Sequence, residues 1–482
     1  MASSEGKSGH GIFFHTSIYG FGHLVARGLS FILLPFYTHY ISSNEFGIYS
    51  LIISSATIVS ILFHLGLQGS FVKYFTSAKS RNEQKLIFSN LIFMISAVSL
   101  PLTVILIFFS REFSNLILHS GEYSASFSLG IISILLMTYS YYFSIVYVTL
   151  ERSKRFVINT VISALLNFVL NVIFIHNLSL GINGIFYAQI ISSIVLILFC
   201  TDVLKTYFQF DYDSGWVKSI LKFGYPFFFS SIFTVLTEVF DRFLVDYYLG
   251  SEKAGIYYLG YRFGLILNLF GISFKNSWLP HYYNFIANLK DDKPNYLGKV
   301  FSKLLVVSAI VIVPVSLFAD DVFSFKYNGF QIFSSEYFEA ASVIPFVMFG
   351  YMFAILMSFY SLGPYISGKS IHFLSSDLLC FASNLLLNIL LIPMIGIVGA
   401  AIATMAAFMI GAFYLNVISS KSIQVNYERK IAIVSLLMIF GFTFLSLLFA
   451  SLILDILLLI VFMIIIHELR VIDFGKLIRL KF

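Results

Sequence analysis

Charged residues are scarce in this chain of 482 residues. Asp, Glu, Lys and Arg together make up 11% of it, whereas a typical soluble domain carries about 25%. Hydrophobic residues make up 59%, and the mean hydropathy is +0.90. This composition excludes a water-soluble globular protein. The two cysteines, Cys200 and Cys380, both lie inside apolar stretches, so no disulfide framework is expected.

Motifs of several enzyme classes are also missing. The chain has no GxxxxGK[ST] phosphate-binding loop, no HExxH pair and no Cys/His cluster at metal-ligand spacing. We therefore expect no ATP hydrolysis, no cofactor and no metal site. The connections between apolar runs are too short for a soluble catalytic domain, so we expect a protein that is not an enzyme. Met1 to Gly11 lacks the apolar run of a cleavable signal peptide, so we expect none.

Long apolar runs are what the chain has instead. Each run is long enough to cross a hydrocarbon core of about 30 Å as a helix. Charged or Gly/Pro/Asn-rich segments separate the runs. We predict an all-α polytopic membrane protein with fourteen transmembrane helices, at 12–41, 46–68, 85–109, 126–149, 155–176, 181–204, 219–248, 253–280, 298–319, 340–362, 372–393, 396–419, 430–451 and 454–468.

The distribution of positive charge tests this count and sets the orientation. Of the 30 Lys and Arg residues, 23 fall in the two ends and the even-numbered connections, and three fall in the odd-numbered ones. Short cytoplasmic loops retain Lys and Arg, so both termini should be cytoplasmic. The net charge of +6 follows from these inward loops, and nucleic acid is not an expected partner.

Three short sequence matches indicate an internal repeat. EFGIYSL (45–51) returns as KAGIYYL (253–259), NFVLN (167–171) as NLLLN (384–388), and GING (181–184) as GIVG (396–399), at offsets of 208 to 217. We predict two parallel six-helix lobes followed by an appendix. The predicted parts are an N-lobe at 1–210, a C-lobe at 211–420, and two additional helices with a tail at 421–482. Parallel repeats of this kind occur in carriers that work by alternating access.

Four basic residues lie inside predicted spans, where a charge costs about 2.5 to 3.5 kcal/mol at mid-bilayer. For anion binding we rank Arg27 first, then Arg262, then Lys275. His23 lies one helical turn before Arg27. A guanidinium suits a phosphate because its planar fork donates several hydrogen bonds. For Arg27 an ion pair with another helix is an equal alternative, and Lys275 lies near a helix end where it can snorkel.

The seventh predicted span holds four charges. Glu238, Arg242 and Asp246 follow one another at intervals of four, so we expect them to pair along one helix face. Asp241 is rotated by about 100° from Arg242. We therefore expect Asp241 to be the acid without an obvious partner.

Depth along the helices indicates a second polar group. Asp241, Asn384, Asn388 and Thr404 should all lie in the outer half of the membrane, near 10 Å below the surface at about 1.5 Å per residue. One carboxylate with amide and hydroxyl oxygens can enclose Na⁺ or serve a proton-linked site. The alternative is that Asn and Thr only form hydrogen bonds between helices.

Three longer stretches carry a family resemblance. PFYTHYISSNEFGIYSL (35–51), DRFLVDYYLGSEKAGIYYLGYR (241–262) and NLLLNILLIPMIGIVGAAIAT (384–404) together resemble Wzx-type flippases, which export O-antigen or capsular repeat units. These flippases belong to the multidrug/oligosaccharidyl-lipid/polysaccharide (MOP) superfamily. The resemblance implies a two-lobed, V-shaped, MATE-like carrier of the cytoplasmic (inner) membrane.

The resemblance also implies a substrate and site residues. The substrate would be a polyprenyl-diphosphate-linked oligosaccharide, with a polysaccharide polymerase and glycosyltransferases as further partners. In related flippases, cations of the first and eighth spans line the cavity, which corresponds here to Arg27 and Arg262. A cation site between spans seven, eleven and twelve corresponds to Asp241, Asn384, Asn388 and Thr404, with Asn388 where a second acid is expected. The alternatives are a cation-coupled exporter of small amphiphiles and a membrane glycosyltransferase or polymerase.

Overall fold

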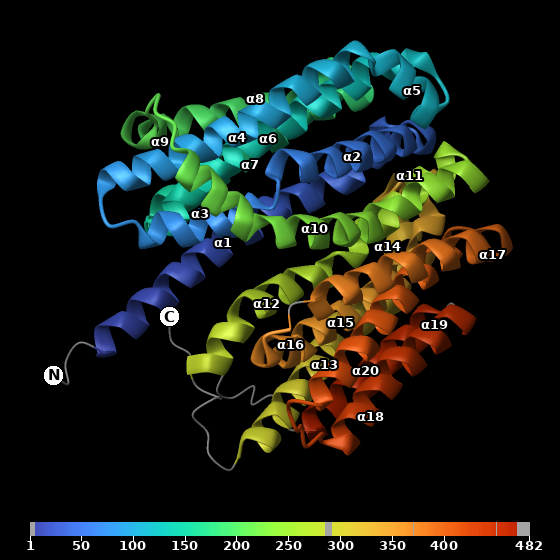
Figure 1. Ribbon diagram of the computed structural model, residues 1–482. Helices are drawn as coiled ribbons and strands as arrows, with labels where there is room; N and C mark the ends of the chain where they lie inside the picture. The colour runs from blue at the N-terminus through green and yellow to red at the C-terminus, as the bar shows by residue number, and fades with distance from the viewer. Residues whose placement is uncertain (1–4, 285–291, 370, 450, 470–482) are drawn as a thin grey trace. The chain divides into compact units, whose positions relative to one another are not determined.

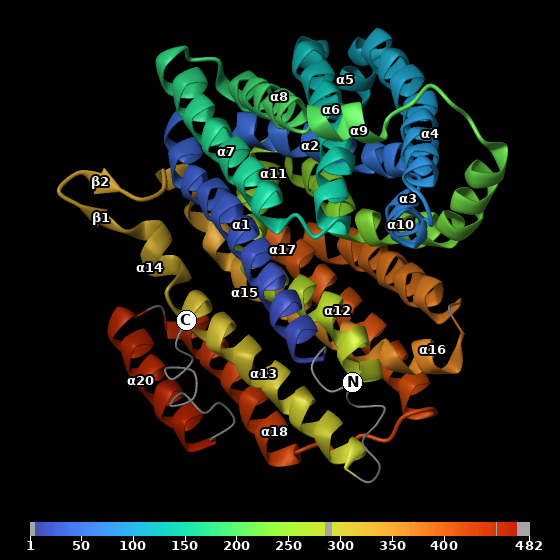
Figure 2. The same cartoon turned by 90° about the vertical axis from the view of Figure 1, so that its left-hand side faces the viewer.

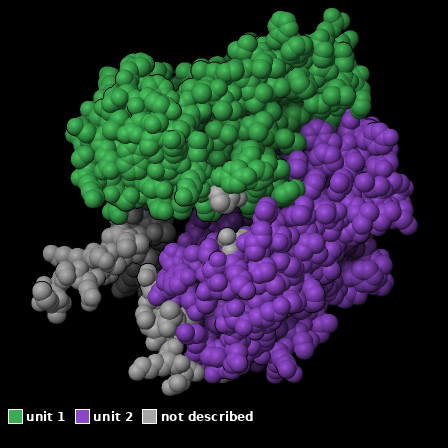
Figure 3. Space-filling model, in the orientation of Figure 1, with its two compact units in different colours: residues 1–235 green, residues 236–482 purple. Residues whose placement is uncertain are grey.

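The computed structural model describes residues 5–284, 292–369, 371–449 and 451–469. Regular structure in these ranges is helical apart from one two-stranded hairpin, which confirms an all-α polytopic chain (Figure 1). The chain divides into two compact units, coloured by residue range in Figure 3. Unit 1 is Met1–Val235 and unit 2 is Leu236–Phe482.

Unit 1 holds the first ten α-helices, the last of which continues into unit 2, and two short helical segments. In chain order these elements are α1 (Glu5–Tyr40), α2 (Ser43–His64), α3 (Leu67–Ser77), α4 (Arg81–Phe108), α5 (Ser110–Leu118), η1 (Gly121–Tyr123), α6 (Ser124–Thr149), α7 (Ser153–Val172), the π-helical turn η2 (Ile173–Asn177), α8 (Gly181–Phe199), α9 (Thr201–Tyr207) and α10 (Ser214–Leu249).

Unit 2 continues with ten further α-helices and the hairpin. They are α11 (Ser251–Gly264), α12 (Ile266–Asn284), α13 (Lys293–Leu317), α14 (Ala319–Ser324), β1 (Lys326–Tyr327), β2 (Phe330–Gln331), η4 (Ser335–Val343), α15 (Ile344–Tyr360), α16 (Leu362–Ser367), α17 (Ile371–Ser420), α18 (Arg429–Leu437), the π-helical turn η5 (Met438–Phe442), α19 (Thr443–Phe449) and α20 (Leu452–Leu469).

The number of membrane spans differs from the count expected from the sequence. Among the described residues, ten helices are long and apolar enough to cross a membrane, or eleven if a bent pair at 214–249 counts as one span. Part of the difference arises because α17 is counted as one helix although it covers two predicted spans, 372–393 and 396–419. The chain is a multi-pass membrane protein, while the total of fourteen spans, the three-part division and the cytoplasmic termini stay predictions.

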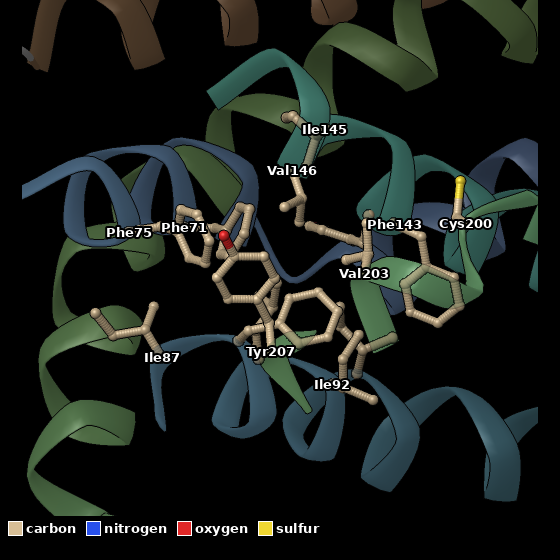
Figure 4. Packing of buried hydrophobic residues seen from close by; sticks show 14 of the residues in the cluster. Phe71, Phe75, Ile87, Ile92, Phe143, Ile145, Val146, Cys200, Val203 and Tyr207 are labelled. Carbon is tan, nitrogen blue, oxygen red and sulfur yellow. The ribbon is translucent and has the colours of Figure 1, made fainter. Parts of the chain in front are cut away.

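Unit 1 has an aromatic core where α3, α4, α6 and α9 meet (Figure 4). Phe71, Phe75 and Phe88 are fully buried, and the ring of Phe75 meets that of Tyr207 edge to face at 5.3 Å. Such ring pairs contribute about 0.5 to 1.5 kcal/mol beyond the area they bury. Outside this core, α6 lies beside α8 (Figure 1), and α1 packs on α7.

Unit 2 is built around α15, which packs against α12, α13 and α17. α13 also packs against α18 and α20 (Figure 2) and against α19, which together are the segments of the two predicted additional helices. The β1–β2 hairpin turns at Asn328 and Gly329, which both have positive φ. Asn-Gly is the usual pair for a two-residue hairpin turn of this kind.

One glycine breaks α17 into two limbs. Gly396 has φ 65° and ψ −145°, and Ile395 before it is also outside the helical region. The backbone of Gly396 lies in a region of φ and ψ that residues with a Cβ rarely adopt. The break falls between the two predicted spans and lets the second limb fold back along the first.

Candidate functional site

Four polar residues of α10 and α17 form a buried network in unit 2. Asp241, Asn388 and Thr404 are fully buried and Asn384 is 1% exposed. The Nδ2 of Asn384 donates to the Oγ1 of Thr404 at 3.2 Å, and the Nδ2 of Asn388 donates to the Oδ1 of Asn384 at 2.9 Å. The Thr404 hydroxyl also interacts with the carboxylate of Asp241. The residues predicted from depth along the helices therefore lie together.

The break in α17 is what brings two of these residues together. Asn384 and Thr404 are twenty residues apart, which in a straight helix would separate them by about 30 Å along the axis. Their side chains are instead in hydrogen-bonding contact. The reversal at Gly396 thus positions the amide of one limb against the hydroxyl of the other.

Arg242 lies next to this network and is 4% exposed. Its Nη1 donates to the Oδ1 of Asp241 at 3.2 Å and to the carbonyl oxygen of Glu238. Its guanidinium lies over the ring of Tyr261, 4.2 Å from the centroid, and 5.6 Å from the ring of Tyr258. Ion pairing and two aromatic faces together make burial of this cation tolerable.

This arrangement differs from the pairing expected from the sequence. Arg242 was expected to pair with the carboxylates of Glu238 and Asp246, which leaves Asp241 free. The ion pair that the structure describes joins Arg242 to Asp241, while Asp246 accepts a hydrogen bond from the hydroxyl of Ser251. Helix spacing alone predicts neighbours on one face, but a long arginine side chain also reaches the adjacent residue when both are buried.

Sequence analysis missed the tyrosines that complete the site. The hydroxyl of Tyr257 donates to the Oδ2 of Asp241, and the hydroxyls of Tyr261 and Tyr351 lie 2.8 Å apart. Tyr257 and Tyr261 are four residues apart on α11, so they share a helix face. That spacing within the motif GIYYLGY (255–261) was the available signal.

Two glycines allow α11 to approach its neighbours. A Cβ at Gly260 would lie 2.4 Å from the carbonyl oxygen of Ala340, and one at Gly264 would lie 2.4 Å from Val347. Small residues at an interval of four let helix backbones come close in a membrane. This close approach carries Tyr261 to Tyr351 and fixes α11 beside the buried network.

The predicted repeat has a counterpart in unit 1 with the same local bonding. Asn171 donates to the carbonyl and the Oδ1 of Asn167, as Asn388 does to Asn384. The Oδ1 of Asn171 accepts a hydrogen bond from Tyr37 at 2.9 Å. The Oδ1 of Asn388, in contrast, has no hydrogen-bond partner among the described residues.

The repeat offset gives the residue that stands in the second copy at the position of Tyr37. Adding the offset of 208 to Tyr37 gives Val245, which is fully buried and has no group to donate. A buried acceptor without a donor costs about 1 to 3 kcal/mol. Among the described residues, the unit 2 copy therefore keeps an unfilled acceptor at Asn388, where the unit 1 copy has a closed pair.

The predicted anion contacts lie on three helices. Arg262 is half-buried on α11, and its guanidinium lies 5.9 Å from the ring of Tyr258. Lys275 is exposed on α12 and interacts electrostatically with Glu238. Arg27 is exposed on α1, in unit 1, and the side chain of His23 lies outside the described residues.

The exposure of Arg262 stands out on its own helix. Every other residue from Ala254 to Gly264 is buried. Arg262 is thus the one position in this stretch that reaches a surface, and it carries a permanent positive charge. A charge at a partly exposed position on an otherwise buried helix favours contact with an anion or with water.

Comparison with solved structures shows a shared fold. The structure of the lipid II flippase MurJ in an inward closed conformation matches 95% of this chain and 99% of its own, with a TM-score of 0.70 at 18% identity. A mutant form of the Vibrio cholerae MATE transporter VcmN matches 86% of this chain and 96% of its own, with a TM-score of 0.60 at 16% identity. An inward-facing multidrug resistance MATE transporter of the MOP superfamily matches 82% and 94%, with a TM-score of 0.62 at 14% identity.

These likenesses assign the MOP fold, as expected from the sequence motifs. Curated proteins give no match to the chain. The family model described as polysaccharide biosynthesis protein matches residues 14–282, which is more than half of the chain. The chain belongs to the polysaccharide biosynthesis protein family.

Proposed function

We propose that this protein is a flippase that moves a polyprenyl-diphosphate-linked oligosaccharide from the inner to the outer leaflet of the cytoplasmic membrane, for surface polysaccharide assembly. Membership of the polysaccharide biosynthesis protein family supports the class of cargo. The fold shared with a lipid II flippase over 95% of the chain supports the mode of action. A polysaccharide polymerase and glycosyltransferases are proposed as functional partners.

The observation that carries the proposal is the partial exposure of Arg262 on an otherwise buried stretch of α11. A diphosphate has several acceptor oxygens, and the guanidinium fork binds them bidentately. Arg27 and Lys275 are exposed cations on other helices, and we propose them and His23 as further anion contacts of the protein. The polyprenyl tail stays in lipid, so the protein only has to shelter the phosphates and the sugars.

We propose that a small cation, Na⁺ or H⁺, drives turnover through the network of Asp241, Asn384, Asn388 and Thr404. The unfilled Oδ1 of Asn388 supports a ligand there, because it is an acceptor with no donor among the described residues. The carboxylate of Asp241 supplies the charge. The oxygens of a carboxylate, an amide and a hydroxyl are ligands that hard cations prefer.

Transport in reconstituted vesicles tests the proposal. The probe is a fluorescent polyprenyl-diphosphate disaccharide, whose arrival in the opposite leaflet is followed by a quencher that does not cross the membrane. We expect vesicles with the wild-type protein to translocate it faster than empty vesicles, and Arg27→Ala and Arg262→Ala to be slower. Unchanged translocation in both variants would refute the anion contacts.

A second probe separates the alternative suggested by the MATE fold. The same vesicles are loaded with ethidium, a cationic amphiphile, and its efflux is measured under a sodium gradient. A flippase should leave ethidium efflux at the level of empty vesicles. Ethidium efflux without movement of the diphosphate probe would favour the exporter of small amphiphiles.

A further inference from the structure

The β1–β2 hairpin of unit 2 has one aromatic face and one polar face. Tyr327 and Phe330 lie directly opposite each other in the strand register, and Lys326 lies opposite Gln331. Successive residues of a strand point to opposite sides, so the two rings share one face and the two polar residues share the other. Tyr327 is 67% exposed and Phe330 is 64% exposed. The hairpin projects from the helices of its own unit (Figure 2), which leaves its aromatic face largely uncovered.

Three buried rings hold the base of the hairpin. Phe323 on α14, before β1, and Phe333, after β2, stack with their centroids 4.2 Å apart and their planes at 7°. Both rings also meet the ring of Phe263 on α11 edge to face, at 5.2 and 5.5 Å. Phe323 and Phe333 are each 1% exposed. The exposed aromatic pair is therefore carried on a base that is fixed to the core of unit 2.

The position of the hairpin in the chain places it at a membrane surface. It joins two candidate spans, the first of which ends at Ser324 and the second of which begins at Ser335. Asp320 and Asp321 lie on α14 just before the hairpin, and charged side chains are costly in the hydrocarbon core. The chain has therefore reached the headgroup layer before β1 begins. That layer is about 5 to 8 Å thick on each side, and the four residues from Ser324 to Asn328 span at most about 13 Å. The hairpin thus cannot extend far beyond the headgroup layer.

The residue types of the exposed face match the chemistry of this layer. Aromatic side chains such as that of Tyr327 are enriched at membrane–water interfaces. Phe330 has no hydrogen-bonding group in its side chain, and neither has Phe325, which is 45% exposed one residue before β1. A face that binds sugars needs polar groups beside its rings to fix their orientation. Apolar rings gain instead by leaving water for lipid, so the composition favours a lipid surface as the partner.

We propose that the aromatic face of the β1–β2 hairpin inserts into the headgroup layer of the bilayer, with Tyr327 and Phe330 toward the acyl chains and Lys326 and Gln331 toward water. Amphipathic helices lie in the membrane interface in the same way, with the apolar face down. Because the base of the hairpin packs on Phe263, this contact sets the depth of that part of unit 2 in the membrane. The inference does not depend on the cargo, since it rests on the hairpin and the spans that flank it.

Spin labels on the two faces of the hairpin test this. Cys200 and Cys380 are both buried, so a cysteine introduced on the hairpin is the one that a thiol-reactive nitroxide reaches. Labelled Phe330→Cys and, as the matched control on the other face, labelled Lys326→Cys are reconstituted into vesicles of phosphatidylcholine and phosphatidylglycerol. Electron paramagnetic resonance then measures collisions of each label with oxygen, which concentrates in lipid, and with a nickel chelate, which stays in water.

The two labels should report different surroundings. We expect the label at position 330 to collide more with oxygen and less with the nickel chelate than the label at position 326. The vesicles contain no other protein, so a face that serves a protein partner would stay in water. Equal access of the nickel chelate to both labels would overturn the proposal.

A second variant keeps an aromatic ring at the tested position. Phe330→Trp adds one indole to the two native tryptophans, whose emission in the wild-type protein is subtracted. In vesicles of lipids with brominated acyl chains, we expect the added emission to be quenched more strongly than that of Lys326→Trp. Equal quenching in the two variants would contradict insertion of the aromatic face. Soluble maltotriose should leave the added emission unchanged, and a change on its addition would assign the face to sugars and overturn the proposal.

Discussion

Asn384 and Thr404 lie twenty residues apart in the sequence, yet the amide of the first donates to the hydroxyl of the second at 3.2 Å. This contact exists because the backbone reverses at Ile395 and Gly396. The candidate ion site is therefore assembled by the turn between the two limbs of α17 in unit 2. The geometry of the site therefore depends on Gly396, although Gly396 contacts neither Asn384 nor Thr404.

Gly396→Ala should lower the stability of the folded protein. Its φ of 65° with ψ of −145° disfavours a Cβ, and strain of this kind costs about 1 to 3 kcal/mol. Thermal unfolding in detergent measures the change. Gly69→Ala is the control, because Gly69 lies inside α3 and a Cβ there has no neighbour within 4 Å. An alanine at 396 that unfolds at the wild-type temperature would contradict the strained turn.

Tyr257→Phe should destabilise the site, because it removes a donor from a fully buried carboxylate. Hydrogen bonds to charged groups contribute about 1.5 to 3 kcal/mol. The melting temperature should fall accordingly. Tyr212→Phe, at a loop position that is 63% exposed, should leave it unchanged. Equal melting of the two variants would show that Asp241 does not depend on this tyrosine.

Asn388→Asp should increase sodium affinity, by an order of magnitude or more. A second carboxylate would stand where the Oδ1 of Asn388 now lacks a partner among the described residues. Asn171→Asp is the matched change in unit 1, where the corresponding oxygen already accepts from Tyr37. Sodium binding to the purified proteins should rise in the first variant only. A rise in both, or in neither, would argue against a cation site at Asn388.

Asp455→Asn should stabilise the protein. Asp455 on α20 is 3% exposed, and its Oδ1 has no hydrogen-bond partner within the described ranges. The charges of Asp320 and Asp321 on α14 act on it unfavourably. Removing one charge relieves both the repulsion and the desolvation, worth about 1 to 3 kcal/mol. Loss of stability would mean that this carboxylate is needed.

Much of the fold followed from the sequence, because apolar runs of membrane length leave few alternatives to helices. The grouping of Asp241 with Asn384, Asn388 and Thr404 also followed, since depth along a helix is set by a fixed rise per residue. The four residues do lie together in unit 2.

The sequence did not show which of several nearby residues a buried charged side chain contacts. Arg242 forms an ion pair with its neighbour Asp241 and also contacts Glu238 one turn earlier, and helix spacing alone predicted only the second of these partners. The division of α17 into two limbs, in contrast, was predicted from the sequence as the separate spans 372–393 and 396–419, and the break lies at Ile395 and Gly396. The roles of Arg27, His23, Arg262 and Lys275 remain predictions for experiment.

The most direct test of the central claim is the initial rate at which reconstituted protein translocates a fluorescent polyprenyl-diphosphate disaccharide, compared between Arg262→Ala and Arg155→Ala. Both variants lose one arginine. Arg262 is partly exposed on an otherwise buried stretch of α11, whereas Arg155 pairs with Asp202 in unit 1. We expect the Arg262 variant to be at least tenfold slower than wild type, because a lost charged hydrogen bond of about 1.5 to 3 kcal/mol corresponds to that factor or more. The Arg155 variant should match wild type. Wild-type rates in both variants would contradict the claim that Arg262 binds the diphosphate.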